Sequence, residues 1–138
     1  MTSARPDPRT GLVELTQQEC WELLGSTSFG RVVVSVGSTP DVFPVNYRLH
    51  NGEILVRTEA GTKLAAATLM RTVAFEIDSH DELAHTGWSV VVKGRGREPD
   101  KLDELVALDD LDLEPWVDTP KTRWLAITPR EVTGRQIV

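Results

Sequence analysis

The sequence has few of the features that define several large protein classes. It contains a single cysteine, Cys20, which excludes an intramolecular disulfide and a cysteine-based zinc site. It has no apolar run near the ~20 residues that a membrane span needs, and its N-terminus lacks the apolar core of a signal peptide. We therefore expect a cytoplasmic protein that makes no use of a membrane.

Basic residues are also scarce: 15 lysines and arginines stand against 21 aspartates and glutamates, giving a net charge of −6. Nucleic-acid-binding domains usually present a basic face, so this balance argues against nucleic acid as a partner. The chain has no GxGxxG fingerprint, no Walker sequence and no GxSxG nucleophile elbow. These absences remove the sequence support for a nucleotide-binding fold or a hydrolase.

The composition that remains is that of one globular domain. Of the 138 residues, 40% are hydrophobic and 26% are charged, which is enough apolar material to bury a core without covalent staples. Residues 1–10 contain Pro6 and Pro8 and show no apolar periodicity, which predicts a flexible N-terminal arm. Residues 11–138 are then the folded domain.

Short extended segments dominate this domain. Helices are predicted after a Thr16 capping box, from Thr62, and after Asp100 as N-cap, while residues 79–87 are expected to form a polar loop. Short strands at close spacing with turn signals between them indicate a barrel or a sandwich. The predicted strands are residues 29–36, 42–50, 53–58, 72–78, 88–97, 123–127 and 132–137.

One stretch, residues 43–67, carries the best functional signal. Asn51-Gly52 predicts a type I′ hairpin turn, and the second strand of this hairpin ends at Arg57-Thr58. Thr62-Lys63 then opens an alanine-rich helix. A guanidinium, hydroxyls, an ammonium and a helix N-terminus within seven residues are the groups that bind phosphate. A solvated turn followed by an ordinary helix cap explains the same residues equally well.

Two further segments carry side chains suited to a planar ligand. A proline inside a strand removes a hydrogen-bond donor, so Pro44-Val45-Asn46-Tyr47 belongs at a sheet edge or beside a ligand. Trp88-Ser89 and Trp124 offer indoles, which stack on planar ligands or fill cores and interfaces. His80 and His85 lie near aspartates in the expected loop, where solvated side chains are the usual outcome, and we expect no metal site.

Six segments together resemble the pyridoxamine 5′-phosphate oxidase-like superfamily of flavin-binding split barrels, especially its short actinobacterial and nitroimidazole-resistance members. They are FGRVVVS, FPVNYRL–NGEILVRT, GTKLAAA, VAFEID, GWSVVVKGRGRE and WLAITPREVTGRQI, and they extend from near residue 12 to residue 138. The resemblance implies a mainly β fold: a six-stranded Greek-key split β-barrel with short flanking helices, assembled as a homodimer with FMN at the interface.

The resemblance also implies which residues form the site. Pro44, Val45, Asn46 and Tyr47 would line the flavin ring; Arg57, Thr58, Thr62 and Lys63 would hold its phosphate; Trp88, Ser89 and Val90 would reach it from the partner subunit; Trp124 and Arg135 would border the substrate. The expected function is an FMN-dependent oxidoreductase acting on a small molecule, with no side chain identified as catalytic. The alternatives are an F420-dependent reductase and a non-catalytic flavin- or haem-binding protein. The chain lacks the basic C-terminal extension of true pyridoxamine phosphate oxidases, so that activity is not expected.

Overall fold

The computed structural model describes residues 5–59, 61–111, 113 and 123–138. Its elements, in chain order, are β1 (Leu12–Glu14), α1 (Gln17–Ser26), β2 (Phe29–Val36), β3 (Thr39–His50), β4 (Glu53–Thr58), α2 (Lys63–Thr68), β5 (Thr72–Asp81), β6 (Thr86–Arg97), α3 (Leu102–Asp109) and β7 (Arg123–Ile137). No helix in the described ranges is long and apolar enough to cross a membrane.

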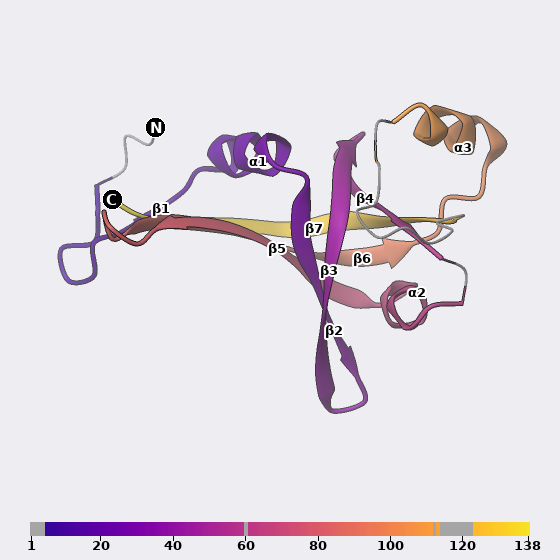
Figure 1. Ribbon diagram of the computed structural model, residues 1–138, viewed down its shortest axis with the longest axis horizontal. Coiled ribbons are helices and arrows are strands. Elements are labelled where there is room, and N and C mark those ends of the chain that lie inside the picture. The colour runs from indigo at the N-terminus through magenta and orange to yellow at the C-terminus, as the bar shows by residue number, and fades with distance from the viewer. Residues whose placement is uncertain (1–4, 60, 112, 114–122) are drawn as a thin grey trace.

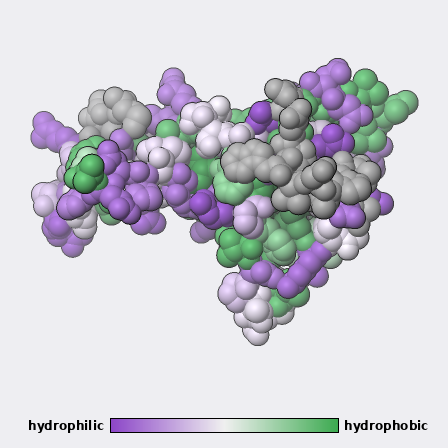
Figure 2. All heavy atoms as spheres, viewed as in Figure 1, coloured by the Kyte–Doolittle hydropathy of each residue, from purple (hydrophilic) through white to green (hydrophobic). Residues whose placement is uncertain are grey.

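The strands form one antiparallel sheet in the order β1-β7-β4-β3-β2-β5-β6, and a further pairing between β6 and β7 closes it into a barrel (Figure 1). The mainly β barrel is therefore confirmed, with the three-residue β1 added to the predicted strands. The distal ends of β5 and β7 run out to one side of the barrel, where β1 and the C-terminus lie (Figure 1). We call this extension the arm; mainly hydrophilic residues cover it in Figure 2.

Period-two alternation builds the core. In β5, Val73, Phe75 and Ile77 are buried, whereas Ala74 and Glu76 lie on the outer side of the sheet. Successive side chains of a strand point to opposite faces, so every strand contributes one set of residues to the interior and one to the outside. We call the outside of the sheet the exterior face.

Two helices close the barrel interior. The predicted capping box at the start of α1 is present: Thr16 Oγ1 accepts a hydrogen bond from the Glu19 backbone, and Glu19 Oε1 accepts one from Thr16 N. Cys20 and Leu24 of α1 join the main core, as do Ala65 and Ala67 of α2. Each of these two helices thus buries one face in the barrel.

Three local predictions are wrong. Residues 79–81 and 86–87 belong to the strands of a long β5–β6 hairpin, because Asp78–Asp81 pair with Thr86–Ser89, and the loop is limited to the turn at residues 82–85. Residues 123–137 form one strand with a register shift opposite Lys93/Gly94, so Pro129 sits at an irregularity within β7. The third helix has Lys101 at its N-cap position, without a side-chain cap from Asp100.

Candidate functional site

The ladder between β3 and β4 ends early and splits the barrel wall. It runs from His50↔Glu53 to Tyr47↔Val56, whereas β3 continues beside β2 as far as Thr39. Residues 39–45 of β3 therefore have β2 as their only strand neighbour among the described strands. Pro44 lies in this half, as expected for a proline in a strand, since it has no N–H to offer a second neighbour. We call this gap the β3–β4 opening.

Hydroxyl and charged groups border the opening where α2 begins. The Oγ1 atoms of Thr58 and Thr62 lie 3.0 Å apart, and Thr62 also caps α2 by accepting the Ala65 N–H. Lys63 Nζ reaches across to Asp41 Oδ2 of β3 at 2.7 Å. This hydrogen bond holds the pKa of Asp41 below its ordinary value. Three of the four residues predicted to bind phosphate thus lie together.

Arg57 points away from these three residues. Because side chains alternate along β4, Arg57 shares the exterior side with Leu55, which packs beneath α3, whereas Thr58 faces the opposite side. Its guanidinium carbon lies 4.7 Å from the centroid of the Trp124 ring, within cation–π range. Its Nε is buried and has no hydrogen-bond partner among the described residues.

Alternation also divides the four residues predicted to line the flavin ring. Val45 and Tyr47 point into the core, while Pro44 and Asn46 are on the exterior face. The Tyr47 hydroxyl donates a 2.5 Å hydrogen bond to the Leu24 carbonyl. Its ring meets Phe75 edge-on, with centroids 4.7 Å apart. Burial raises the pKa of Tyr47 well above its ordinary value, so this side chain is a neutral core group.

The residues predicted on β6 divide in the same way. Val90 is fully buried in the core, whereas Ser89 lies opposite Asp78 of β5 and Arg135 of β7. A hollow of about 340 Å³ is lined by Trp88, Ser89 and Arg135, together with Leu12, Asp78, Ser79, His80, Gly87 and Ile137. We call it the arm hollow.

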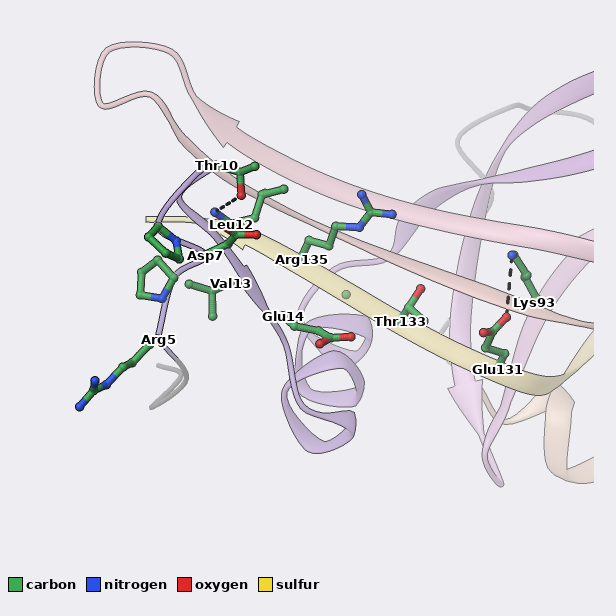
Figure 3. Close-up of a pocket in the computed structure, with 13 residues that line it drawn as sticks. Arg5, Asp7, Thr10, Leu12, Val13, Glu14, Lys93, Glu131, Thr133 and Arg135 are labelled. Atoms are coloured by element: carbon green, nitrogen blue, oxygen red, sulfur yellow. Dashed lines mark hydrogen bonds and ion pairs between the residues drawn. The ribbon is translucent and has the colours of Figure 1, made fainter.

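Trp124 and Arg135, both predicted to border the substrate, lie near opposite ends of β7. At ~3.3 Å per residue, the two are separated by roughly 35 Å of strand. Trp124 belongs with Arg57 beneath α3, and its Nε1 donates to Asp109 at 3.3 Å. Arg135 lies on the arm, and its side chain projects from the same stretch of β7 as that of Thr133 (Figure 3).

A larger hollow of about 750 Å³ follows the outer side of β7 toward the residues that precede β1 (Figure 3). Its lining mixes both charges, including Arg5, Asp7, Glu14 and an exposed ion pair between Lys93 and Glu131 at 3.8 Å. The balance of charge marks it as a polar surface rather than as a pocket for one kind of ligand.

One charged cluster was not singled out from the sequence. On the exterior face, Arg31 Nη1 lies 3.0 Å from Glu76 Oε1 and 3.5 Å from Asp78 Oδ2. Burial and a hydrogen bond with Asp78 raise the pKa of Glu76 to about 7, against the lowering effect of Arg31. The outward position of Glu76 and Asp78 follows from alternation, but their contact with Arg31 depends on strand register.

Comparison with known proteins defines the class to which this split barrel belongs. The family described as pyridoxamine 5′-phosphate oxidase matches residues 16–136. The chain is 35% identical to an uncharacterized protein of Mycobacterium tuberculosis, Rv0080, over 98% of this chain and 91% of the relative. The chain therefore belongs to the pyridoxamine 5′-phosphate oxidase family.

Solved structures share the fold. An FAD-binding protein from Mycobacterium smegmatis is 38% identical, covers 91% of this chain and 100% of its own, and superposes with a TM-score of 0.81. An FAD-binding protein from Mesorhizobium loti is 22% identical, with coverage of 92% and 99% and a TM-score of 0.76. The second similarity concerns the fold alone. The split-barrel architecture expected from the sequence is confirmed.

Proposed function

We propose that this protein is a flavin-dependent oxidoreductase that acts on a small molecule. The observation that carries the proposal is the similarity to the FAD-binding protein of M. smegmatis, which spans nearly the whole of both chains at 38% identity. A flavin performs the redox chemistry itself, and the protein supplies binding, orientation and electrostatics. The open side of β3 and the hydroxyls beside it support the same proposal.

The residues around the β3–β4 opening fit a flavin phosphate. Thr58 and Thr62 present two hydroxyls side by side, and the ammonium of Lys63 lies on the next residue. Lys63 would exchange Asp41 for the phosphate, a change its mostly exposed side chain permits. Pro44 and Asn46 lie on the exterior face of β3, so the flavin would have to pass through the opening for its ring to meet them.

FMN is the form of flavin that we propose. One lysine beside two hydroxyls suits a single phosphate, whereas the longer charged groups of FAD and F420 call for more contacts. Mass analysis of the ligand released from purified protein distinguishes FMN from FAD and F420.

We further propose that the protein acts as a homodimer. Within one chain, β2 and β5 separate β3 from β6, so at ~4.8 Å per strand roughly 14 Å of sheet lies between Pro44 and the β6 residues. Trp88 and Ser89 are therefore remote from the β3–β4 opening of their own chain. A second copy that brings its Trp88 and Ser89 to that opening would complete each site.

Replacing Lys63 with alanine tests the phosphate assignment. Loss of one charge-assisted contact is expected to weaken FMN binding about 10- to 100-fold, corresponding to roughly 1.5–3 kcal/mol. Fluorescence titration of the flavin measures the dissociation constant. Lys93→Ala is the matched control, because Lys93 has similar exposure but pairs with Glu131 of β7. Equal FMN affinity in both variants would refute the role of Lys63. A purified protein that is colourless and leaves flavin fluorescence unchanged would refute flavin binding altogether.

Replacing Tyr47 with phenylalanine separates packing from cofactor binding. The change leaves the Leu24 carbonyl without its hydrogen bond in a fully buried place, so a loss of about 1–2 kcal/mol of unfolding free energy is expected. FMN affinity should not change, because the hydroxyl points to α1. Urea unfolding and flavin titration on the same sample measure both quantities. A tenfold loss of affinity at unchanged stability would place the hydroxyl at the cofactor instead.

A further inference from the structure

The acid pair, Glu76 and Asp78, lies between the two sets of residues that we propose for the flavin site. On one side, Glu76 is the cross-strand neighbour of Arg31, which in turn is the neighbour of Pro44. On the other side, Asp78 is the neighbour of Ser89, and it lines the arm hollow with Arg135. The pair is therefore a direct neighbour of Ser89, and Arg31 lies between the pair and Pro44 on the exterior face of the same chain.

The groups that face the pair come from three strands. Arg31 of β2 contacts both carboxylates. On β6 the direct neighbours are Val91 and Ser89, which carry no charge, and Lys93 lies beyond Val91 and pairs with Glu131. Across the arm hollow lie Arg135 of β7 and His80 of β5. Within the described part of the chain, one arginine in contact with two carboxylates leaves one negative charge without a direct counter-ion.

This arrangement favours one shared proton. Two carboxylates in contact do not both ionise easily, so the proton comes off the pair near neutrality and not near the ordinary carboxyl range. The Glu76 side chain is only 25% exposed, whereas Asp78 is more open and borders the arm hollow. A proton held by the pair thus has a route from the partly buried carboxyl to the cavity surface.

We propose that Glu76 and Asp78 form a proton-exchanging pair that serves a ligand bound on the exterior face beside Ser89. In this step an O–H bond of the pair breaks and the proton passes to a basic atom of the ligand, leaving the pair with no proton; no electrons are transferred. In the reverse step the pair takes the proton back. The inference rests on the proposed flavin site and assigns to it a proton donor that the sequence left unidentified.

The pH dependence of FMN affinity tests the pair. The dissociation constant is measured by fluorescence titration from pH 5.5 to 8.5 for the wild type and for Glu76→Gln, whose amide cannot exchange the proton. Because binding is linked to protonation of the pair, the wild-type constant is expected to change about 3- to 10-fold across neutrality beyond any change in the variant. Any titration of the FMN phosphate itself is common to both proteins and cancels in the comparison.

Three further variants sharpen the result. Glu76→Asp keeps a carboxyl and should restore the wild-type pH profile, whereas Glu131→Gln, an exposed carboxyl on β7, should leave it unaltered. Asp78→Asn is the second test of the pair and should remove the pH dependence if Glu76→Gln fails to fold. Infrared titration of carboxyl absorption in the ligand-free protein should show a group that deprotonates near pH 7 and is absent from Glu76→Gln.

Two outcomes overturn the inference, and they are distinguishable. Parallel pH profiles for the wild type and Glu76→Gln, with tight FMN binding in both, would remove the proton-exchanging role and leave the flavin site standing. Absence of FMN binding at every pH would remove the flavin site and, with it, the pair's proposed ligand.

Discussion

Replacing Gly96 with alanine is expected to damage both the fold and the proposed cofactor site. A Cβ at Gly96 would lie 2.1 Å from the Thr68 carbonyl oxygen and 2.7 Å from the carbonyl carbon. These atoms belong to the backbone at the end of α2, so they cannot rotate aside as a side chain does. Overpacking of this kind costs about 1–3 kcal/mol of unfolding free energy, and the backbone contact places Gly96→Ala at the upper end.

The same change should weaken flavin binding, because Gly96 fixes α2 to the barrel. Its carbonyl accepts the Met70 N–H at 2.9 Å, and its own N–H donates to Arg71 at 3.1 Å. A shift of this junction moves α2, and with it Thr62 and Lys63 at the other end of the helix. We expect a loss of FMN affinity of about tenfold, equivalent to roughly 1.4 kcal/mol.

Gly25→Ala is the matched control for Gly96→Ala. A Cβ at Gly25 would meet only Leu49 Cδ1 at 3.9 Å, an ordinary contact. Because Gly25 lies within α1, alanine there should stabilise the protein by about 0.5–1 kcal/mol and leave flavin binding unchanged. Urea unfolding followed by circular dichroism and flavin titration compare the two. Equal midpoints for both variants would contradict the clash at Gly96.

Local sequence patterns predicted the architecture because they act over a few residues. Asn51 and Gly52 have φ values of 51° and 74°, the positive angles that a type I′ turn requires, so the central hairpin is confirmed. The alternation of β5 placed Phe75 and Ile77 inside. Strand ends were less well predicted, since polar residues at 79–81 and 86–87 pair well beyond the core.

Hydrophobic spacing alone does not predict which side chains of α3 are buried. Leu102, Leu105, Val106 and Leu108 have the spacing of an apolar helical stripe, but Leu102 is 78% and Val106 57% exposed, and hydrophobic spheres mark the α3 end in Figure 2. Only Leu108 is buried, with Leu105 packed against the small cluster beneath α3. A short helix lying on the outside of a barrel covers too little area to bury a full stripe.

The candidate site was harder to predict than the fold because it depends on faces and register. Adjacent residues in a strand point to opposite sides, so neither Pro44–Tyr47 nor Arg57-Thr58 was able to act as one surface. The alternation of side chains can be read from the sequence. The contact of Arg31 with Glu76 cannot, because it joins residues 45 positions apart through the β2–β5 register.

The arginine that fastens α3 to the barrel gives the second large effect. Arg97 of β6 donates from Nε and Nη2 to the two oxygens of Glu53 at 2.8 and 2.6 Å, and it also binds Glu104 of α3. Glu53 is only 15% exposed. Arg97→Ala would leave this carboxylate without its cation, which for a buried pair costs about 3–5 kcal/mol. Because the Arg97 side chain is 37% exposed, we expect roughly 2–3 kcal/mol.

The pH dependence of that loss identifies its cause. Hydrogen bonds from Arg97 lower the pKa of Glu53 below its ordinary value of 4.5. A carboxyl whose pKa is lower in the folded state contributes stability above its unfolded pKa and loses it as the pH falls through the folded value. The difference in unfolding free energy between the wild type and Arg97→Ala should therefore be full at pH 7 and shrink below about pH 4.5.

Arg123→Ala is the control, because it removes the same charge from an ion pair in which the arginine is more exposed. Arg123 makes an ion pair of similar length with Glu98, at 2.9 Å, but its side chain is 52% exposed. Exposed pairs contribute about 0–1 kcal/mol, so this variant should unfold close to the wild type at every pH. If Arg97→Ala is no worse than Arg123→Ala at pH 7, the clamp contributes nothing beyond a surface ion pair. If it is worse, α3 is fastened over Trp124 and Arg57 by a partly buried charge network, and displacement of α3 should expose these two side chains.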